Sequence, residues 1–266
     1  MNVFKFELRS LRIMLLLWAL AFVALITIYV SVYPSFSKDA AATRQLFATL
    51  PFAVHAALGM NVETLFSFLG FLGNVFTVIL LASAMFGASL GLGLFSREGR
   101  ARTTDFLLTK PRRRSSIFFA KCVAGIVSIV GMTLVIVFTT FMMSQVVKAG
   151  DYDLRIFFMI TSVAGMIQLW FFAVGALLSQ LIPKLRTVTP TALAVAFGIF
   201  LIGTIGALVD SDTIRWIAPA KYVDFSHVVQ YGTYQYEYLR VGAAIIILSL
   251  LGSFFIYTRK DVRSLT

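Results

Sequence analysis

Few residues of this sequence could do covalent chemistry, and the most prominent is Ser89. The run Gly87-Ala88-Ser89-Leu90-Gly91 fits G-x-S-x-G, the nucleophile elbow whose serine attacks a carbonyl with the help of a histidine. An elbow needs a strand, a strained turn and a helix, whereas this run lies inside a continuous apolar helix pattern. We therefore interpret Gly87 and Gly91 as small residues that let two helices pack closely. A membrane-embedded enzyme that uses Ser89 is the alternative.

Metal and nucleotide chemistry have little support in the sequence. Its two histidines, His55 and His227, lack H-E-x-x-H or any other ligand spacing, and both fall in predicted outer loops. The single cysteine, Cys122, excludes an intrachain disulfide and a cysteine metal cluster. The chain has no G-x-x-x-x-G-K-[ST] loop to hold a nucleotide. We expect neither a metal nor a cofactor in this chain.

The composition indicates an integral membrane protein. The chain has 266 residues, of which 59% are hydrophobic and only 13% charged, too few for the polar surface of a soluble protein of this size. Its net charge of +11 would suit nucleic acid. Long apolar blocks interrupt the basic residues, however, so they form no continuous phosphate-binding face, and we expect no nucleic-acid partner.

The apolar blocks predict an all-α integral membrane protein with six transmembrane helices in a single domain, residues 1–266. The predicted spans are 13–33, 66–94, 117–147, 156–182, 190–209 and 241–257. Residues 1–12 predict an N-terminal interfacial elbow helix, with Phe4, Leu8 and Leu11 on one stripe. Span 13–33 is longer than the apolar core of a signal peptide, which favours a span over a cleaved leader. Residues 34–65 and 210–240 predict outer segments with short helices and interfacial aromatic residues.

The distribution of charge predicts the topology. Sixteen of the 23 Lys and Arg residues, with Lys121 at the start of the third span counted as inner, and four of the 12 acids fall on the predicted inner side, which gives +12 inside and −1 outside. Basic loops stay on the cytosolic side of a bilayer, so we expect both termini in the cytosol and the protein in the plasma membrane.

Polar side chains within the spans are mostly uncharged. When the third span is counted from Cys122, none of the six apolar cores contains Lys, Arg, Asp, Glu or His, which disfavours an ion-driven mechanism. Any driven transport would then take its energy from another chain. Asn74, Thr77 and Gln168 are polar groups that either join helices or line a pathway.

The basic segment 96–116 lies between the second and third spans. It begins SREGRARTTDFLLTK, and residues 103–108 can form about two turns of amphipathic helix before Pro111. Such a helix would expose apolar side chains to water unless a partner or the membrane surface covered them. The alternative is that the segment is only a positively charged cytosolic anchor.

Several motifs in chain order resemble the ABC-2 type permeases of ABC transporters. Glu98, Thr103, Asp105, Leu107, Leu108, Pro111 and Lys121 fall in the pattern E-x4-T-x-E/D-x-L-L-x2-P-x9-K, which resembles that family's first cytoplasmic loop. Pro219, Lys221, Tyr222 and Asp224 resemble its P-x-K-Y-x-D segment before the last helix. The run LPFAVHAALGM resembles its first outer loop, and Arg259, Lys260 and Asp261 its basic ending.

The resemblance implies the permease of a short ATP-driven exporter. Two six-helix permeases, identical or paralogous, would pair above two separate ATPase subunits, which would bind ATP and Mg. The uncharged helices would suit an amphipathic or hydrophobic cargo such as a peptide, drug or lipid. A further alternative for the function of the chain is a channel or scaffold that uses no nucleotide. The implied ATPase-coupling residues are Glu98, Arg102, Thr103, Thr104, Asp105, Phe106, Leu107, Leu108, Lys110, Lys184 and Arg186.

Overall fold

A computed structural model describes residues 3–38, 67–101, 114–182, 187–208, 216 and 218–259. Six long helices in these ranges are each apolar and long enough to cross a bilayer, as the sequence predicts. They are α1 (Val3–Ser31), α6 (Phe68–Ala101), α8 (Arg114–Val146), α9 (Leu154–Leu181), α10 (Val188–Leu208) and α13 (Tyr236–Arg259). The described residues contain no strand, so the described part of the fold is all-α.

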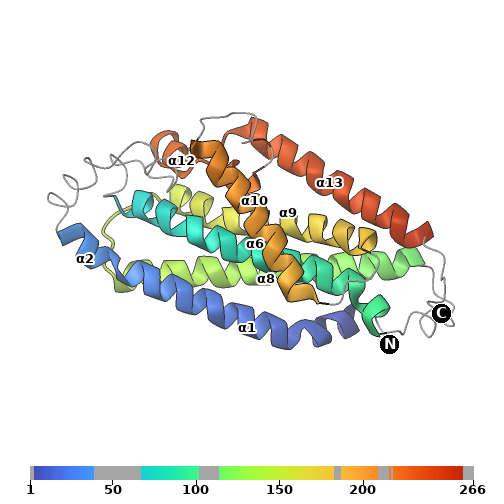
Figure 1. Cartoon of the computed structure of the whole chain (residues 1–266). Coiled ribbons are helices and arrows are strands. Elements are labelled where there is room, and N and C mark those ends of the chain that lie inside the picture. The colour runs from blue at the N-terminus through green and yellow to red at the C-terminus, as the bar shows by residue number, and fades with distance from the viewer. Residues whose placement is uncertain are drawn as a thin grey trace.

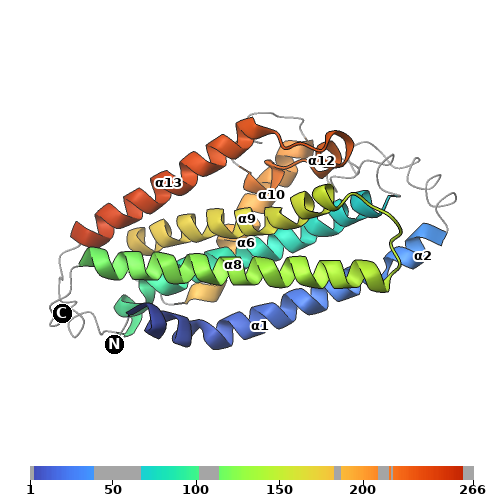
Figure 2. The same cartoon turned by 180° about the vertical axis from the view of Figure 1, so that it is seen from behind.

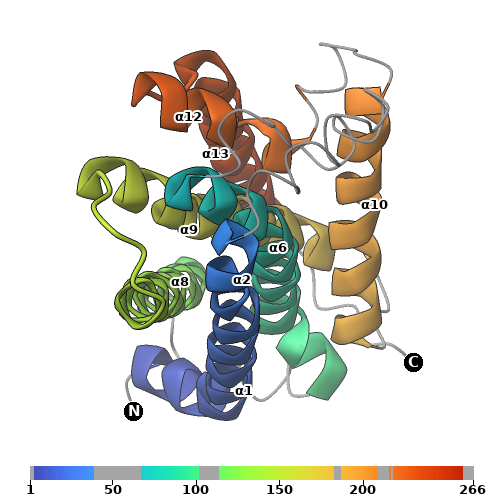
Figure 3. The ribbon, with the colours of Figure 1, turned by 90° about the vertical axis from the view of Figure 1, so that its left-hand side faces the viewer.

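The helices differ from the predicted spans mainly where polar residues extend them. The predicted elbow and first span form one uninterrupted helix, α1, although Figure 3 shows its first turns at an angle to the rest. Of the predicted basic segment 96–116, residues 96–101 belong to α6 and residues 114–116 to α8. The predicted boundaries were set by polarity and mark the apolar spans, and a helix can continue beyond the apolar layer. At 34 residues α6 is about 51 Å long, against about 30 Å of hydrocarbon.

Two helices form the centre of the bundle. In α6 and α9 the most apolar stretch is 72% and 61% buried, against 17% in α1, α10 and α13. The end-on view of Figure 3 shows α6 and α9 in the middle, with the other long helices around them. Figure 2 shows α8 between α1 and α9, and it packs against both. The outer helices keep apolar faces exposed, as expected of helices that face lipid.

Small residues hold the two central helices together. A Cβ atom on Gly87 would collide with the backbone of Gln168, and one on Gly91 with the carbonyl oxygen of Phe172. On the opposite helix, a Cβ on Gly175 would come within 2.9 Å of the Ala88 carbonyl oxygen. Close backbone approach of this kind requires glycine, so the G-x-S-x-G run forms part of the α6–α9 contact.

The helices run alternately between two ends of the bundle (Figure 1). At the α6–α8 end, α1 begins, α6 ends, α8 begins and α13 ends. The opposite end, where α8 ends and α9 begins, carries the short helices α2 (Tyr33–Lys38), η1 (Pro219–Lys221) and α12 (Phe225–Tyr231). Asp153 caps the first turn of α9 there, and Asp224 caps α12 by accepting from the amides of Ser226 and His227.

Candidate coupling site

Most of the residues that the resemblance assigns to ATPase coupling lie outside the described part of the chain. This is so for residues 102–110, and for Lys184 and Arg186. Glu98 lies within α6, and its side chain is not among those described. The structure does describe the two helix ends that bound the segment, up to Ala101 on α6 and from Arg114 on α8. The coupling assignment therefore stays a prediction.

A buried charge cluster of Glu7, Arg97 and Lys121 lies at this base. The Glu7 carboxylate on α1 lies 3.4 Å from the Arg97 guanidinium on α6 and 3.6 Å from the Lys121 ammonium on α8. The Lys121 side chain is fully buried and that of Glu7 is 4% exposed, whereas that of Arg97 is 39% exposed. Three helices that are far apart in sequence thus meet at one carboxylate.

The charges of the cluster have further partners. Lys121 Nζ also donates to the Leu94 carbonyl oxygen, and the Arg97 guanidinium donates to the Ser10 hydroxyl. Both cations also lie over aromatic rings, with Arg97 5.7 Å from the centre of the Phe6 ring and Lys121 5.9 Å from that of Phe95. Buried ions repay their lost hydration only when they are paired and hydrogen-bonded. The cluster meets both conditions, so it can persist in an apolar interior.

Neighbouring contacts join two more helices to the end of α6. The Gln180 amide on α9 donates to the Phe95 carbonyl oxygen at 3.4 Å. The Phe95 ring lies 5.0 Å from that of Phe118 on α8 and 6.4 Å from that of Tyr257 on α13. Phe118 also packs edge-on against Phe254 at 5.3 Å. The base of the coupling segment is therefore a junction to which α1, α6, α8, α9 and α13 all contribute.

Ser89 has no catalytic surroundings among the described residues. Its side chain is buried inside α6, and the described histidine, His227, lies on α12 at the opposite end. Helix α12 reaches α6 at Gly73, which is 16 residues and about 24 Å along the helix from Ser89. His55 lies outside the described residues. In the parts of the chain that the structure describes, no three His, Cys, Asp or Glu side chains gather where they could hold a metal ion.

The three polar candidates for pathway lining do not share one location. Gln168 is fully buried on α9, and neither its amide oxygen nor its amide nitrogen has a hydrogen-bond partner among the described residues. Asn74 and Thr77 are partly exposed on α6. Their helical spacing continues into Val78 and Leu81, which help to line an apolar cavity of about 280 Å³ between α1 and α6. Asn74 and Thr77 thus lie on the same stripe of α6 as the residues that line this cavity, which we call the groove between α1 and α6.

Six apolar helices in the described residues, with the charged residues at their ends, define a multi-pass membrane protein. The model of the ABC-2 family transporter proteins matches residues 1–262, nearly the whole chain. The chain belongs to this family, and it is a permease component of an ABC transporter. Permeases of the family work with ABC ATPase partners. A comparison with curated proteins gives no match.

Proposed function

We propose that this permease forms the membrane half of an ATP-driven exporter. Two copies, or one copy and a paralogue, pair in the plasma membrane with both termini in the cytosol. Two ATPase subunits bind ATP and Mg and dock on residues 98–110, with Lys184 and Arg186 as a smaller contact. In this arrangement the chain needs no cofactor of its own.

The junction at the end of α6 is the observation that best supports coupling through this segment. The coupling segment can transmit a displacement only if it is firmly attached to the spans. Glu7, Arg97 and Lys121 join α1 to both helices that bound the segment. Gln180 and Tyr257 extend the attachment to α9 and α13. A displacement of the segment by an ATPase would therefore move several spans together, because packed interiors transmit strain.

The groove between α1 and α6 is the best-supported candidate for a substrate contact. Its walls are apolar and include Trp18, Phe22 and Met85. Asn74 and Thr77 lie along the same stripe of α6 towards the opposite end of the bundle. Apolar walls with a few polar groups suit an amphipathic or hydrophobic cargo such as a lipid, drug or peptide. Gln168, enclosed between helices, would reach a substrate only if α6 and α9 separated.

The decisive experiment concerns Leu107 and Leu108. Changing both to Ser should abolish co-purification with the ABC ATPase partner of this permease, and abolish substrate-stimulated ATP hydrolysis. The reason is that apolar anchors commonly dominate such interfaces, while charges at the rim mainly steer the approach. Insertion and pairing of the permease should be unchanged, because the segment lies outside the spans.

A matched double change separates docking from simple charge anchoring. Changing Arg112 and Arg113 to Ser removes two charges from the same segment and leaves its apolar residues in place. This variant should keep its ATPase bound. If the leucine variant retains a coupled ATPase, or if only the arginine variant loses it, the docking proposal fails.

A further inference from the structure

The last turns of α6 are turned away from the axis of the rest of the helix (Figure 1 and Figure 3). The helix is nevertheless continuous from Phe68 to Ala101. Bends in a helix arise at glycine and serine, or where a side chain bonds into the ladder of backbone hydrogen bonds. Both causes occur together at residues 92–96, close to where α6 runs into the coupling segment.

Three backbone carbonyls in this stretch accept a hydrogen bond from a side chain. The carbonyls are those of Leu92, Leu94 and Phe95, and their donors are, in the same order, Ser96 of α6, Lys121 of α8 and Gln180 of α9. In a regular helix each carbonyl accepts from the amide four residues further along the chain. Each of these three carbonyls therefore has a second donor in addition to its helical one.

The second donors lower the cost of opening the helix at this point. If the amides of residues 96–99 left the ladder, the carbonyls of residues 92–95 would lose their helical partners. Leu92, Leu94 and Phe95 are buried, and a buried carbonyl without a donor is strongly unfavourable. Three of the four carbonyls would keep a side-chain donor, so this stretch can open at a lower cost than a buried helix without such donors.

A glycine without a packing role lies in the same stretch. A Cβ atom on Gly93 would meet no atom within 4 Å, whereas one on Gly87 or Gly91 would collide with the backbone of α9. Packing therefore requires glycine at residues 87 and 91 but leaves room for alanine at residue 93. Glycine weakens a helix relative to alanine, because its backbone gains more freedom when the helix opens. Gly93 thus also favours opening at this point.

We propose that α6 bends at a hinge over residues 92–96 when an ATPase displaces the coupling segment. Gly93 supplies the flexibility, and the side chains of Ser96, Lys121 and Gln180 are positioning residues that hold the freed carbonyls. Two of these donors lie on α8 and α9, so both helices stay attached to α6 while its last turns move. The displacement by an ATPase rests on the proposed function, whereas the hinge rests on the contacts of α6.

Hydrogen–deuterium exchange of the full chain in lipid nanodiscs tests the opening of the helix. The quantity measured is the exchange rate of the amides of residues 96–99. Gly93→Ala should slow this exchange about fivefold, because alanine stabilises the closed helix. Gly131→Ala on α8 is the matched control, since a Cβ atom there also meets no atom within 4 Å, and it should leave the rate unchanged. An unchanged rate in Gly93→Ala, or equal slowing in both variants, overturns the hinge.

Gln180→Leu distinguishes a hinge from a simple fastening by the sign of its effect. In the closed helix the Phe95 carbonyl keeps its helical amide, but in the open hinge it would have no donor. The hinge therefore predicts exchange at residues 96–99 that is at least fivefold slower than in the unchanged protein. A side chain that only fastens the closed helix predicts faster exchange, and a faster or unchanged rate overturns the proposal. Ser253→Ala removes a similar bond, from α13 to the Ala176 carbonyl at 3.1 Å, and should leave the rate unchanged.

The use of the hinge in coupling is tested with the ATPase partner present. In Gly93→Ala we expect the ATPase to co-purify as before and substrate-stimulated ATP hydrolysis to fall at least threefold, while Gly131→Ala keeps both. Unchanged stimulation in Gly93→Ala would overturn the role of the hinge. If the unchanged permease binds no ATPase, the proposed function fails and with it the source of the displacement, whereas the exchange rates report on the hinge alone.

Discussion

The buried charge cluster gives the sharpest stability prediction. Glu7→Gln preserves the size of the side chain and removes its charge, which leaves the Lys121 ammonium fully buried without its carboxylate. Breaking a buried ion pair from one side costs about 3 to 5 kcal/mol. The distances of 3.4 and 3.6 Å exceed those of the strongest charged hydrogen bonds, and the Leu94 carbonyl still accepts from Lys121, so we expect about 3 kcal/mol. For a chain of this size that lowers the melting temperature by about 6 to 12 °C.

Two assays and two controls make this prediction testable. The first assay uses Cys122, which is next to Lys121 and is the single thiol of the chain: its reaction with a thiol-reactive dye reports opening of the cluster. The second assay, size-exclusion chromatography after heating to a series of temperatures, reports loss of the whole fold. Glu237→Gln removes an exposed charge and should cost less than about 1 kcal/mol. Glu7→Gln with Lys121→Met leaves no unpaired buried charge and should recover most of the loss. A single variant within 2 °C of the unchanged protein, or a double variant no better than the single, refutes the reasoning.

Three further predictions concern topology, the glycine contact and a buried tyrosine. In a background without Cys122, a membrane-impermeant thiol reagent on intact cells should label cysteines at outer positions only, and labelling of an inner position would contradict the proposed topology. The outer positions are Asp153 and Thr233, and the inner ones are Thr109 and Ser264. Ser89→Ala should leave transport within a few-fold. Gly87→Ala, two residues away, should lower the melting temperature, because its Cβ would collide with the Gln168 backbone. A loss of transport by orders of magnitude in Ser89→Ala would instead support a catalytic nucleophile. Burial raises the pKa of Tyr222 to about 12, which favours the neutral phenol in the fold, so its contribution to stability should be full below pH 10 and fall as the pH rises to 12. Tyr222→Phe should cost about 1 kcal/mol at neutral pH and remove that part of the pH dependence, and an unchanged slope in chemical denaturation would contradict this assignment.

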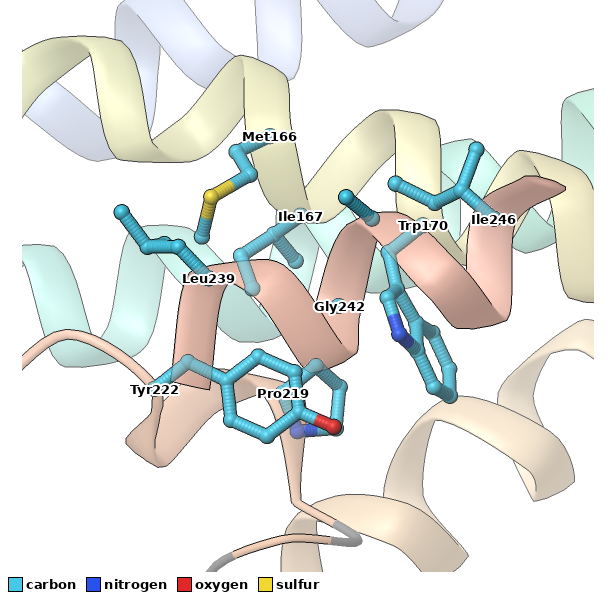
Figure 4. A pocket seen from close by; sticks show the side chains of 9 residues that line it. Met166, Ile167, Trp170, Pro219, Tyr222, Leu239, Gly242 and Ile246 are labelled. Carbon is cyan, nitrogen blue, oxygen red and sulfur yellow. The ribbon is translucent and has the colours of Figure 1, made fainter. Parts of the chain in front are cut away.

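Hydropathy was sufficient to predict the six spans, because the cost of exposing backbone and polar groups to lipid acts on each helix separately. It could not predict which helices form the centre. That depends on packing between helices, and in α6 and α9 it follows from glycines such as Gly87 and Gly175 at the contact. The sequence prediction that Gly87 and Gly91 pack helices agrees with their position, but the partner helix was not identified. The cavity that Trp170, Tyr222 and Gly242 help to line (Figure 4) could not be predicted from the sequence either, because α9, η1 and α13, which form it, are far apart in the chain.

The charge cluster was missed although the sequence contained a signal for it. Glu7 falls between Phe4 and Leu11 at helical spacing, so this carboxylate shares the apolar stripe of its helix. Lys121 likewise shares the buried stripe of α8, with Phe118 before it and Ala124 after it. Two opposite charges on two buried stripes are expected to form an ion pair, because an unpaired buried ion is strongly disfavoured. Both residues belong to the predicted inner charges, and no pairing between them was predicted.

The position of Lys121 also bears on what drives transport. A proton-coupled pump needs ionisable groups that can change charge along a path through the membrane. Lys121 is fully buried, but it is only seven residues, or about 10 Å, from the start of α8, and it is paired with Glu7 and bonded to a backbone carbonyl. A cation held in this way at one end of the bundle fixes helices to one another. This arrangement favours a structural role, and it agrees with a family whose permeases work with ATPase partners.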